Sequence, residues 1–145
     1  MNTKEPSEKR SLIVQAIIGG IIGGIIVDTF LLIALHVSPL ALEARNAALL
    51  AGPGASPVLG LIAHFAIAIA WAVTYAYAFN ALGRLQNWVL GTIVLGITVN
   101  AVMNLAITLK TGAPWGAGFV ADLITNVIFY ALPVAAYLAL RIGRP

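Results

Sequence analysis

The sequence predicts an all-α integral membrane protein, a four-helix bundle that forms a single domain over residues 1–145. Hydrophobic residues make up 61% of the chain and charged residues only 9%, whereas soluble domains carry about 25% charged residues. Four apolar runs are each long enough for a helix that crosses about 30 Å of hydrocarbon, which takes about 20 residues. A water-soluble domain of this size could not bury so much apolar surface.

The first predicted span covers residues 12–37 and reads LIVQAIIGGIIGGIIVDTFLLIALHV. It follows a basic tail, residues 1–11, and is too long for the apolar core of a signal peptide, so we interpret it as a retained span. Four glycines form two overlapping GxxxG patterns. Such a face lets another helix come close, and we expect it to serve helix packing. These glycines are Gly19, Gly20, Gly23 and Gly24.

A connection over residues 38–57 leads to the second span. Its stretch Leu40–Leu50 favours a helix, which we expect to lie at the membrane surface. The second span, residues 58–79, alternates alanine with large residues, a pattern that hints at a strand. A strand of a membrane barrel would alternate polar with apolar residues, so a helix is the better prediction.

The third and fourth spans cover residues 88–109 and 119–140, and we expect Pro133 to kink the fourth. Lysines and arginines are distributed unequally over the ends of the four spans. Most lie in the N-terminal tail, the second loop and the C-terminal tail, and only Arg45 and Lys110 lie on the other side. The positive-inside rule therefore predicts that both termini are cytoplasmic. Trp88 and Trp115 fall at opposite interfaces, as residues of an aromatic belt do.

Polar residues within the predicted spans gather in the outer half of the bundle. At about 1.5 Å per residue, Asp28 lies about 14 Å below the outer end of the first span, and His64 about 9 Å below that of the second. We expect these two side chains to pair in the bundle interior. The candidate ligand- or ion-binding residues are Asp28, His64, Asn100, Asn104, Asp122 and Asn126.

Most of these residues also have a purely structural interpretation. The asparagines can join helices by hydrogen bonds, Asp122 can be a first-turn residue that the helix dipole favours, and His36 can reach the membrane interface. His64 can be a hydrogen-bonded core histidine. Asp28 is the strongest functional candidate, because a carboxylate in lipid costs at least about 2.5 kcal/mol.

Other features exclude whole classes of function. The chain has no cysteine, which excludes disulfides and thiolate metal sites. The basic residues lie at helix ends and not in a patch with stacking aromatic residues, so we expect no nucleic-acid partner. No HExxH, Glu-x-x-His or nucleophile motif occurs, which favours a protein that is not an enzyme and has no cofactor. The sequence alone assigns no metal ligand.

Three stretches resemble a group of small bacterial inner-membrane proteins with four spans, whose function is unknown. They are GGIIGGIIVDTF, HFAIAIAWAVTYAY from His64 to Tyr77, and LGITVNAVMNLAI from Leu95 to Ile107. The resemblance covers the first three spans and implies a bacterial inner-membrane location. It also implies that Asp28, His64 and Asn104 are the polar positions of the family, and it brings no known activity.

Three functional hypotheses follow. In the first, a polar pocket that opens outward binds or conducts a proton, a cation or a small polar solute. In the second, the chain is a structural subunit whose glycine face packs against another membrane protein or a second copy. In the third, two histidines and two carboxylates bind a metal. The lipid bilayer is a partner in all three.

Overall fold

The computed structural model describes residues 4–34, 36–114 and 119–142, of which residues 4–10 are described by their backbone alone. Four of its helical stretches are long and apolar enough to cross a membrane: Ser11–Ala34, Pro57–Ala81, Trp88–Thr111 and Phe119–Ile142. The predicted all-α bundle with four spans is therefore confirmed, and the chain is a multi-pass membrane protein. The elements are α1 (Lys4–Ala34), α2 (Pro39–Ala51), α3 (Pro57–Ala81), α4 (Trp88–Thr111), α5 (Phe119–Ile124), the π-helical segment η1 (Thr125–Ala131) and α6 (Leu132–Ile142).

The helix ends follow from local chemistry. Pro57 opens α3, where its missing N–H costs nothing, and the hydroxyl of Ser56 accepts a hydrogen bond from the amide of Val58. The side chain of Asn87 caps α4 by accepting from the amide of Leu90 at 3.1 Å. Gly112 ends α4 in the left-handed conformation, with a φ of 70°, which glycine adopts without strain.

The ends of α1 differ most from the predicted ones, and those of the other spans differ by two residues at most. The helix α1 begins at Lys4, so it continues the first span into the predicted tail, and it ends at Ala34 instead of Val37. In the fourth span, η1 ends just before Pro133. Proline lacks the N–H that the preceding turn needs, and its ring clashes with the carbonyl of the residue four positions earlier. A π-helical turn at this place accommodates the irregularity that Pro133 introduces.

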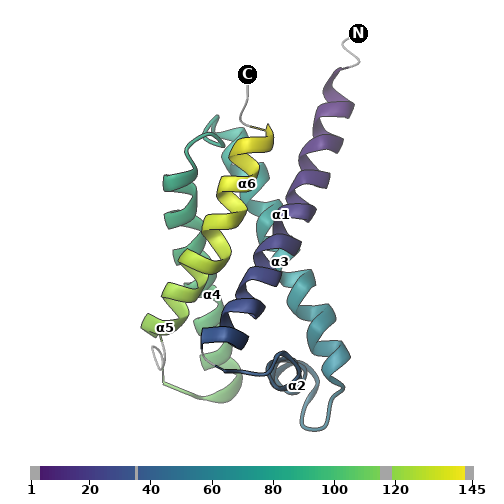
Figure 1. Cartoon of the computed structure of the whole chain (residues 1–145), viewed down its shortest axis with the longest axis vertical. Coiled ribbons are helices and arrows are strands. Elements are labelled where there is room, and N and C mark those ends of the chain that lie inside the picture. Colours follow the sequence, from purple (N-terminus) through teal and green to yellow (C-terminus); the bar gives the residue numbers. More distant parts are fainter. Residues whose placement is uncertain (1–3, 35, 115–118, 143–145) are drawn as a thin grey trace.

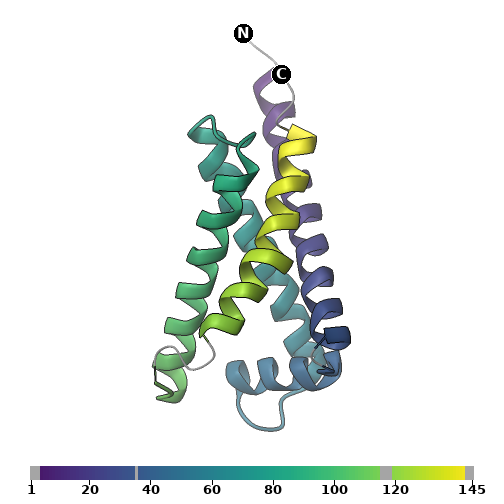
Figure 2. The same cartoon turned by 60° about the vertical axis from the view of Figure 1, so that its left-hand side comes forward.

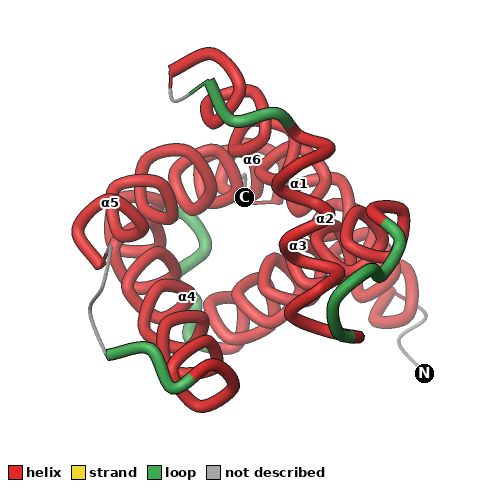
Figure 3. Tube along the Cα trace, turned by 90° about the horizontal axis from the view of Figure 1, so that it is seen from below, coloured by secondary structure: helices red, strands yellow, loops and turns green. Residues whose placement is uncertain are grey.

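The four spans lie side by side, and α2 lies across one end of them (Figures 1 and 2). We call this end the α2 end. The start of α1 and the end of α6 lie together at the opposite end, the terminal end. Viewed along its axis, the bundle forms a ring of spans (Figure 3), in which α1 packs mainly against α3 and α6, and α4 against α6 and η1. The helices α3 and α4 make few contacts with each other.

The glycines of α1 allow two neighbours to come close at once. A Cβ atom on Gly20 would lie 2.7 Å from the Cα atom of Ile69 in α3, and one on Gly23 would lie 2.8 Å from the ring of Tyr130 in η1. The predicted use of the glycine face in helix packing is confirmed. Each of the two overlapping GxxxG patterns serves a different helix, which their offset of one residue makes geometrically possible.

The buried apolar core lies mostly in the half of the bundle toward the terminal end. All four spans contribute buried side chains to it, and Ala16 of α1, Ala72 of α3 and both Val134 and Leu138 of α6 have an exposed fraction of 0%. The half toward the α2 end instead contains the polar side chains and a cavity. The fold thus separates a packed apolar half from a half with polar side chains and a cavity.

Candidate functional site

Three ionisable side chains from three helices meet near the α2 end: Asp28 of α1, Glu43 of α2 and His64 of α3. The His64 Nε2 atom lies 3.6 Å from an oxygen of Asp28. The other ring nitrogen, Nδ1, lies 3.7 Å from an oxygen of Glu43. The imidazole therefore lies between two carboxylates. We call these three residues the charged cluster, and the predicted proximity of Asp28 and His64 is confirmed.

The true end of α1 explains why these side chains lie at the same depth. Asp28 precedes the last residue of the helix, Ala34, by six positions, or about 9 Å. His64 follows the first residue of α3, Pro57, by seven positions, or about 10 Å. The predicted difference of about one turn came from extending the first span to Val37, so the two residues are better matched in depth than the sequence suggested.

Glu43 was not among the predicted site residues. We expected the helix in the first loop to lie at the membrane surface. In the structure, α2 packs against α3, and Glu43 is only 3% exposed. Gly60 makes this contact possible, because a Cβ atom there would collide with the carbonyl group of Glu43. One turn after Gly60 comes His64, so the same close approach brings Glu43 to the imidazole.

The charged cluster is not satisfied by hydrogen bonds of its own. Asp28 Oδ1, Glu43 Oε1 and His64 Nε2 are buried, and none has a hydrogen-bond partner within the described residues. The second oxygen of Glu43 accepts a hydrogen bond from Asn46 at 3.2 Å. One ligand atom from each of the three residues lies within 4.8 Å of the other two, an arrangement that could hold a metal ion.

The three predicted asparagines form a second group, the amide cluster, between α4 and η1. The side-chain oxygen of Asn100 accepts hydrogen bonds from the amide groups of Asn104 and Asn126, each at 3.2 Å. Asn104 also donates to the backbone oxygen of Asn100 at 3.0 Å. Asn100 is fully buried. The bond from Asn126 joins η1 to α4, as the structural interpretation of the asparagines predicted.

The remaining polar candidates lie elsewhere. Asp122 is exposed in α5, and His36 is exposed in the loop after α1 with a φ of 52°. Trp115, predicted as a belt residue, and Arg144 of the predicted C-terminal tail lie outside the described residues. The six predicted site residues therefore divide into one charged pair, one group of amides and the separate Asp122.

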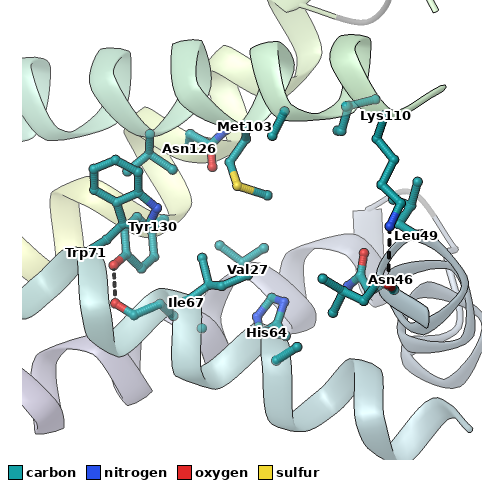
Figure 4. A pocket seen from close by; sticks show the side chains of 17 residues that line it. Val27, Asn46, Leu49, His64, Ile67, Trp71, Met103, Lys110, Asn126 and Tyr130 are labelled. Carbon is teal, nitrogen blue, oxygen red and sulfur yellow. Dashed lines mark hydrogen bonds between the residues drawn. The ribbon is translucent and has the colours of Figure 1, made fainter. Parts of the chain in front are cut away.

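A cavity of about 280 Å³ lies between α3 and α4, next to both clusters (Figure 4). His64 is the only member of the charged cluster among its lining residues, and Asn126 is the only member of the amide cluster. Near α2, the ammonium group of Lys110 donates a hydrogen bond to the carbonyl oxygen of Leu50 at 3.1 Å. Most of the wall of this cavity is apolar, and polar groups line it at a few points. The apolar wall includes Val27, Ile67, Trp71, Val99, Met103 and Ile107.

Comparisons with protein families, with curated proteins and with solved structures found no match to this chain. The resemblance to bacterial inner-membrane proteins with four spans therefore stays a prediction.

Proposed function

We propose that this membrane protein binds a divalent transition-metal cation through Asp28, Glu43 and His64. One observation carries the proposal: three ligand atoms from three helices lie within 4.8 Å of one another, and each of the three residues has a buried polar atom without a hydrogen-bond partner among the described residues. This proposal joins the cation of the first functional hypothesis to the metal of the third.

Charge balance favours a divalent cation. The buried Glu43 and the partly buried Asp28 carry two negative charges, and a buried charge is stable only when it is paired or bound to a metal. A proton on His64 would leave the cluster with one net negative charge, whereas a divalent cation bound to a neutral imidazole leaves none. A single carboxylate in a membrane interior costs at least about 2.5 kcal/mol. The neutral cluster with a divalent cation should therefore be clearly more stable than the cluster with one net negative charge.

The distance between His64 and Asp28 also suits a metal. Separations of 3.6 and 3.7 Å between nitrogen and oxygen are too long for good hydrogen bonds. Tetrahedral ligands with bonds of about 2.0–2.2 Å lie roughly 3.3–3.6 Å from one another. Asp28 and Glu43 face different nitrogens of His64, and a metal can bind to only one of these nitrogens. One of the two carboxylates therefore has to turn toward the metal when the metal binds.

The donor set points to the class of metal. Imidazole is a good ligand for zinc and iron, and carboxylates also bind manganese, whereas magnesium and calcium prefer oxygen ligands alone. One nitrogen and two carboxylate groups therefore favour Zn²⁺ or Mn²⁺ over Mg²⁺. Three protein ligands leave a coordination position for water.

The distribution of basic residues supports an orientation for the site. Six lysines and arginines flank the terminal end in the predicted topology, and only Arg45 and Lys110 flank the α2 end. We propose that the terminal end is cytoplasmic and that the protein lies in a bacterial inner membrane. The charged cluster would then receive its cation from the outer side.

The glycine face gives less support to a structural subunit. Gly19, Gly20, Gly23 and Gly24 all contact helices of the same chain. The surface that would dock another protein is therefore already used inside the bundle. This observation makes cation binding the better-supported function.

The experiment uses the full chain in nanodiscs, freed of metal by a chelator and titrated with Zn²⁺, Mn²⁺ or Mg²⁺ in a calorimeter. We expect saturable binding of Zn²⁺ or Mn²⁺ and much weaker binding of Mg²⁺. The variants Asp28→Asn, Glu43→Gln and His64→Gln should each lose more than the roughly 10- to 100-fold in affinity that is typical of residues behind the direct ligands. The matched variants Asp122→Asn and His36→Gln should bind like the wild type.

Two results would overturn the proposal. One is wild-type protein that binds none of the three metals, which would leave protonation as the way in which the cluster is neutralised. The other is equal loss of affinity in Asp122→Asn and Asp28→Asn, which would mean that metals bind at exposed carboxylates.

A further inference from the structure

We propose that the cavity between α3 and α4 binds a small neutral molecule that carries a hydroxyl group on a ring-sized apolar body, such as a phenol or a cyclic alcohol. The cavity shares only His64 with the proposed cation site, because neither Asp28 nor Glu43 lines it. The inference therefore goes beyond the proposed function and does not depend on it.

The size of the cavity sets the size of the ligand. An engineered apolar cavity of about 150 Å³ takes up benzene. The cavity here has a volume of about 280 Å³, enough for one or two rings. Ligand sites of this kind are mostly apolar with a few polar groups that fix orientation. The wall around Ile67, Val99 and Met103 fits that description.

A hydrogen-bond acceptor lies on the η1 side of the cavity. The amide nitrogen of Asn126 donates to Asn100 at 3.2 Å, which fixes the orientation of the Asn126 side chain. Its oxygen is directed into the cavity (Figure 4). The amide cluster thus holds one acceptor in a defined position at the wall.

A hydrogen-bond donor lies on the α3 side. The indole ring of Trp71 lines the cavity, and its nitrogen faces the interior (Figure 4). This N–H group has no hydrogen-bond acceptor within the described part of the chain. Tyr130, next to Trp71, is not a free donor, because its hydroxyl donates to the carbonyl oxygen of Ala68 at 2.5 Å.

An acceptor and a donor on an apolar wall define the chemistry of the ligand. A hydroxyl group donates one hydrogen bond and accepts others, so it can be paired by Asn126 and by Trp71. A hydrocarbon chain from a lipid would fill the same volume but would leave both groups without a partner. An anion would meet the oxygen of Asn126, and it would also lie near the carboxylates of the charged cluster. A neutral hydroxyl compound is the best match.

The experiment compares two probes of similar shape, 2-naphthol and 2-methoxynaphthalene. Only the first has a hydroxyl proton to donate, and both partition into detergent and lipid. Their binding to the full chain in nanodiscs is followed by probe fluorescence, with protein-free nanodiscs subtracted. We expect saturable binding of 2-naphthol and binding of 2-methoxynaphthalene that is weaker by roughly two- to tenfold, the value of one hydrogen bond.

Matched variants locate the binding. Ala106→Phe places a ring in the cavity and should abolish binding, whereas Ala78→Phe, at an exposed position of α3 that does not line the cavity, should leave it unchanged. Trp71→Phe keeps an aromatic ring but removes the donor, and it should weaken 2-naphthol binding by roughly two- to tenfold. Glu43→Gln should bind 2-naphthol like the wild type, which separates a failure of this inference from a failure of the cation proposal.

Several results would overturn the inference. Unsaturable uptake of 2-naphthol, or equal binding by Ala106→Phe and Ala78→Phe, would mean that the probe does not occupy the cavity. Equal affinity for the two probes would exclude recognition of the hydroxyl group. A lipid that co-purifies with the wild type but not with Ala106→Phe would assign the cavity to an acyl chain.

Discussion

The two polar clusters lie in the same half of the bundle but differ in how well hydrogen bonds satisfy their polar atoms. In the amide cluster, Asn100 accepts hydrogen bonds from both of its partners at 3.2 Å. In the charged cluster, the nearest approaches of His64 to Asp28 and Glu43 are 3.6 and 3.7 Å. In the first cluster, the amide nitrogen of Asn100 is the one buried atom without a partner among the described residues, whereas the second cluster has three such atoms, on two carboxylates and an imidazole.

This difference separates a structural role from a binding role. Neutral amides lose little when they leave water, provided that they bond to one another, and in membranes they join helices. Carboxylates lose far more and need a counter-charge. The amide cluster therefore stabilises the contact between α4 and η1. We propose that a bound cation stabilises the charged cluster, and this is our central claim.

The largest expected effect comes from the glycines that let the helices approach. Gly20→Leu places a side chain where the Cβ atom alone would lie 2.7 Å from the backbone of Ile69. It should separate α1 from α3, reduce stability by several kcal/mol and abolish metal binding. Gly96→Leu clashes with Val127 in η1, with a Cβ distance of 2.8 Å to its Cα atom, and should disrupt the amide cluster instead. Thermal unfolding in detergent, with and without Zn²⁺, measures both variants.

Gly24→Leu provides a graded comparison for that prediction. Its Cβ atom would meet the ring of Phe65 at 2.9 Å and no backbone atom. A side chain can turn away more readily than a backbone can move, so the loss of stability should be smaller than for Gly20→Leu. Equal stability of Gly20→Leu and the wild type would contradict the close packing of α1 on α3.

Asn100→Leu should have the next largest effect. It replaces a fully buried side chain by one of similar size and removes the acceptor of two hydrogen bonds. The amide groups of Asn104 and Asn126 are left without that acceptor, which costs about 1–3 kcal/mol for an unsatisfied buried group. Zn²⁺ affinity should not change. The exposed Asn80→Leu is the control, and a stability equal to that control would show that the amide cluster contributes nothing.

Glu43→Gln should behave in the opposite way. With a chelator present, the wild type has two carboxylates without a cation, so the loss of one charge should leave its unfolding temperature unchanged or raise it. With Zn²⁺ at 100 times its dissociation constant, the wild type should gain about 2.7 kcal/mol, and the variant should gain far less. A metal-free variant that is less stable than the metal-free wild type would mean that Glu43 is already satisfied without a cation.

The smallest expected effect belongs to the exposed link between α2 and α4. Lys110→Met removes the hydrogen bond to the carbonyl oxygen of Leu50 but keeps most of the apolar stem. Because both groups are exposed, we expect a loss of stability of about 0.5–1.5 kcal/mol at most. Amide hydrogen exchange in α2 should become slightly faster. Exchange in α2 as slow as in the wild type would show that α2 is held by its packing on α3 alone.

The sequence predicted the fold better than the site. Four apolar runs and the bilayer thickness define the spans almost completely, and the glycine pattern predicted close packing of α1. The approach of Asp28 to His64 was also predictable, because an isolated carboxylate in the membrane needs a partner. The local pattern did not reveal that each of the two GxxxG patterns faces a different helix.

Glu43 shows where prediction from the pattern failed. A short helix with a glutamate and an arginine in a loop is typical of a membrane surface. The burial of Glu43 depends on a close contact between α2 and α3. This contact is possible because Gly60, which lies in the next helix of the chain, has no side chain. Ala47, one turn after Glu43 and likewise buried, was the available sign of a buried face. The cavity was also not predictable, because it results from the weak contact between α3 and α4.

The most direct test of the central claim is X-ray absorption spectroscopy of the Zn²⁺-loaded protein. The account predicts a metal bound by one imidazole nitrogen and by carboxylate oxygens, with bond lengths of about 2.0–2.2 Å. The imidazole signal should disappear in His64→Gln and persist in His36→Gln and in Asn100→Leu. A spectrum with oxygen ligands alone, or an imidazole signal that survives in His64→Gln, would contradict the assignment of the charged cluster as a cation site.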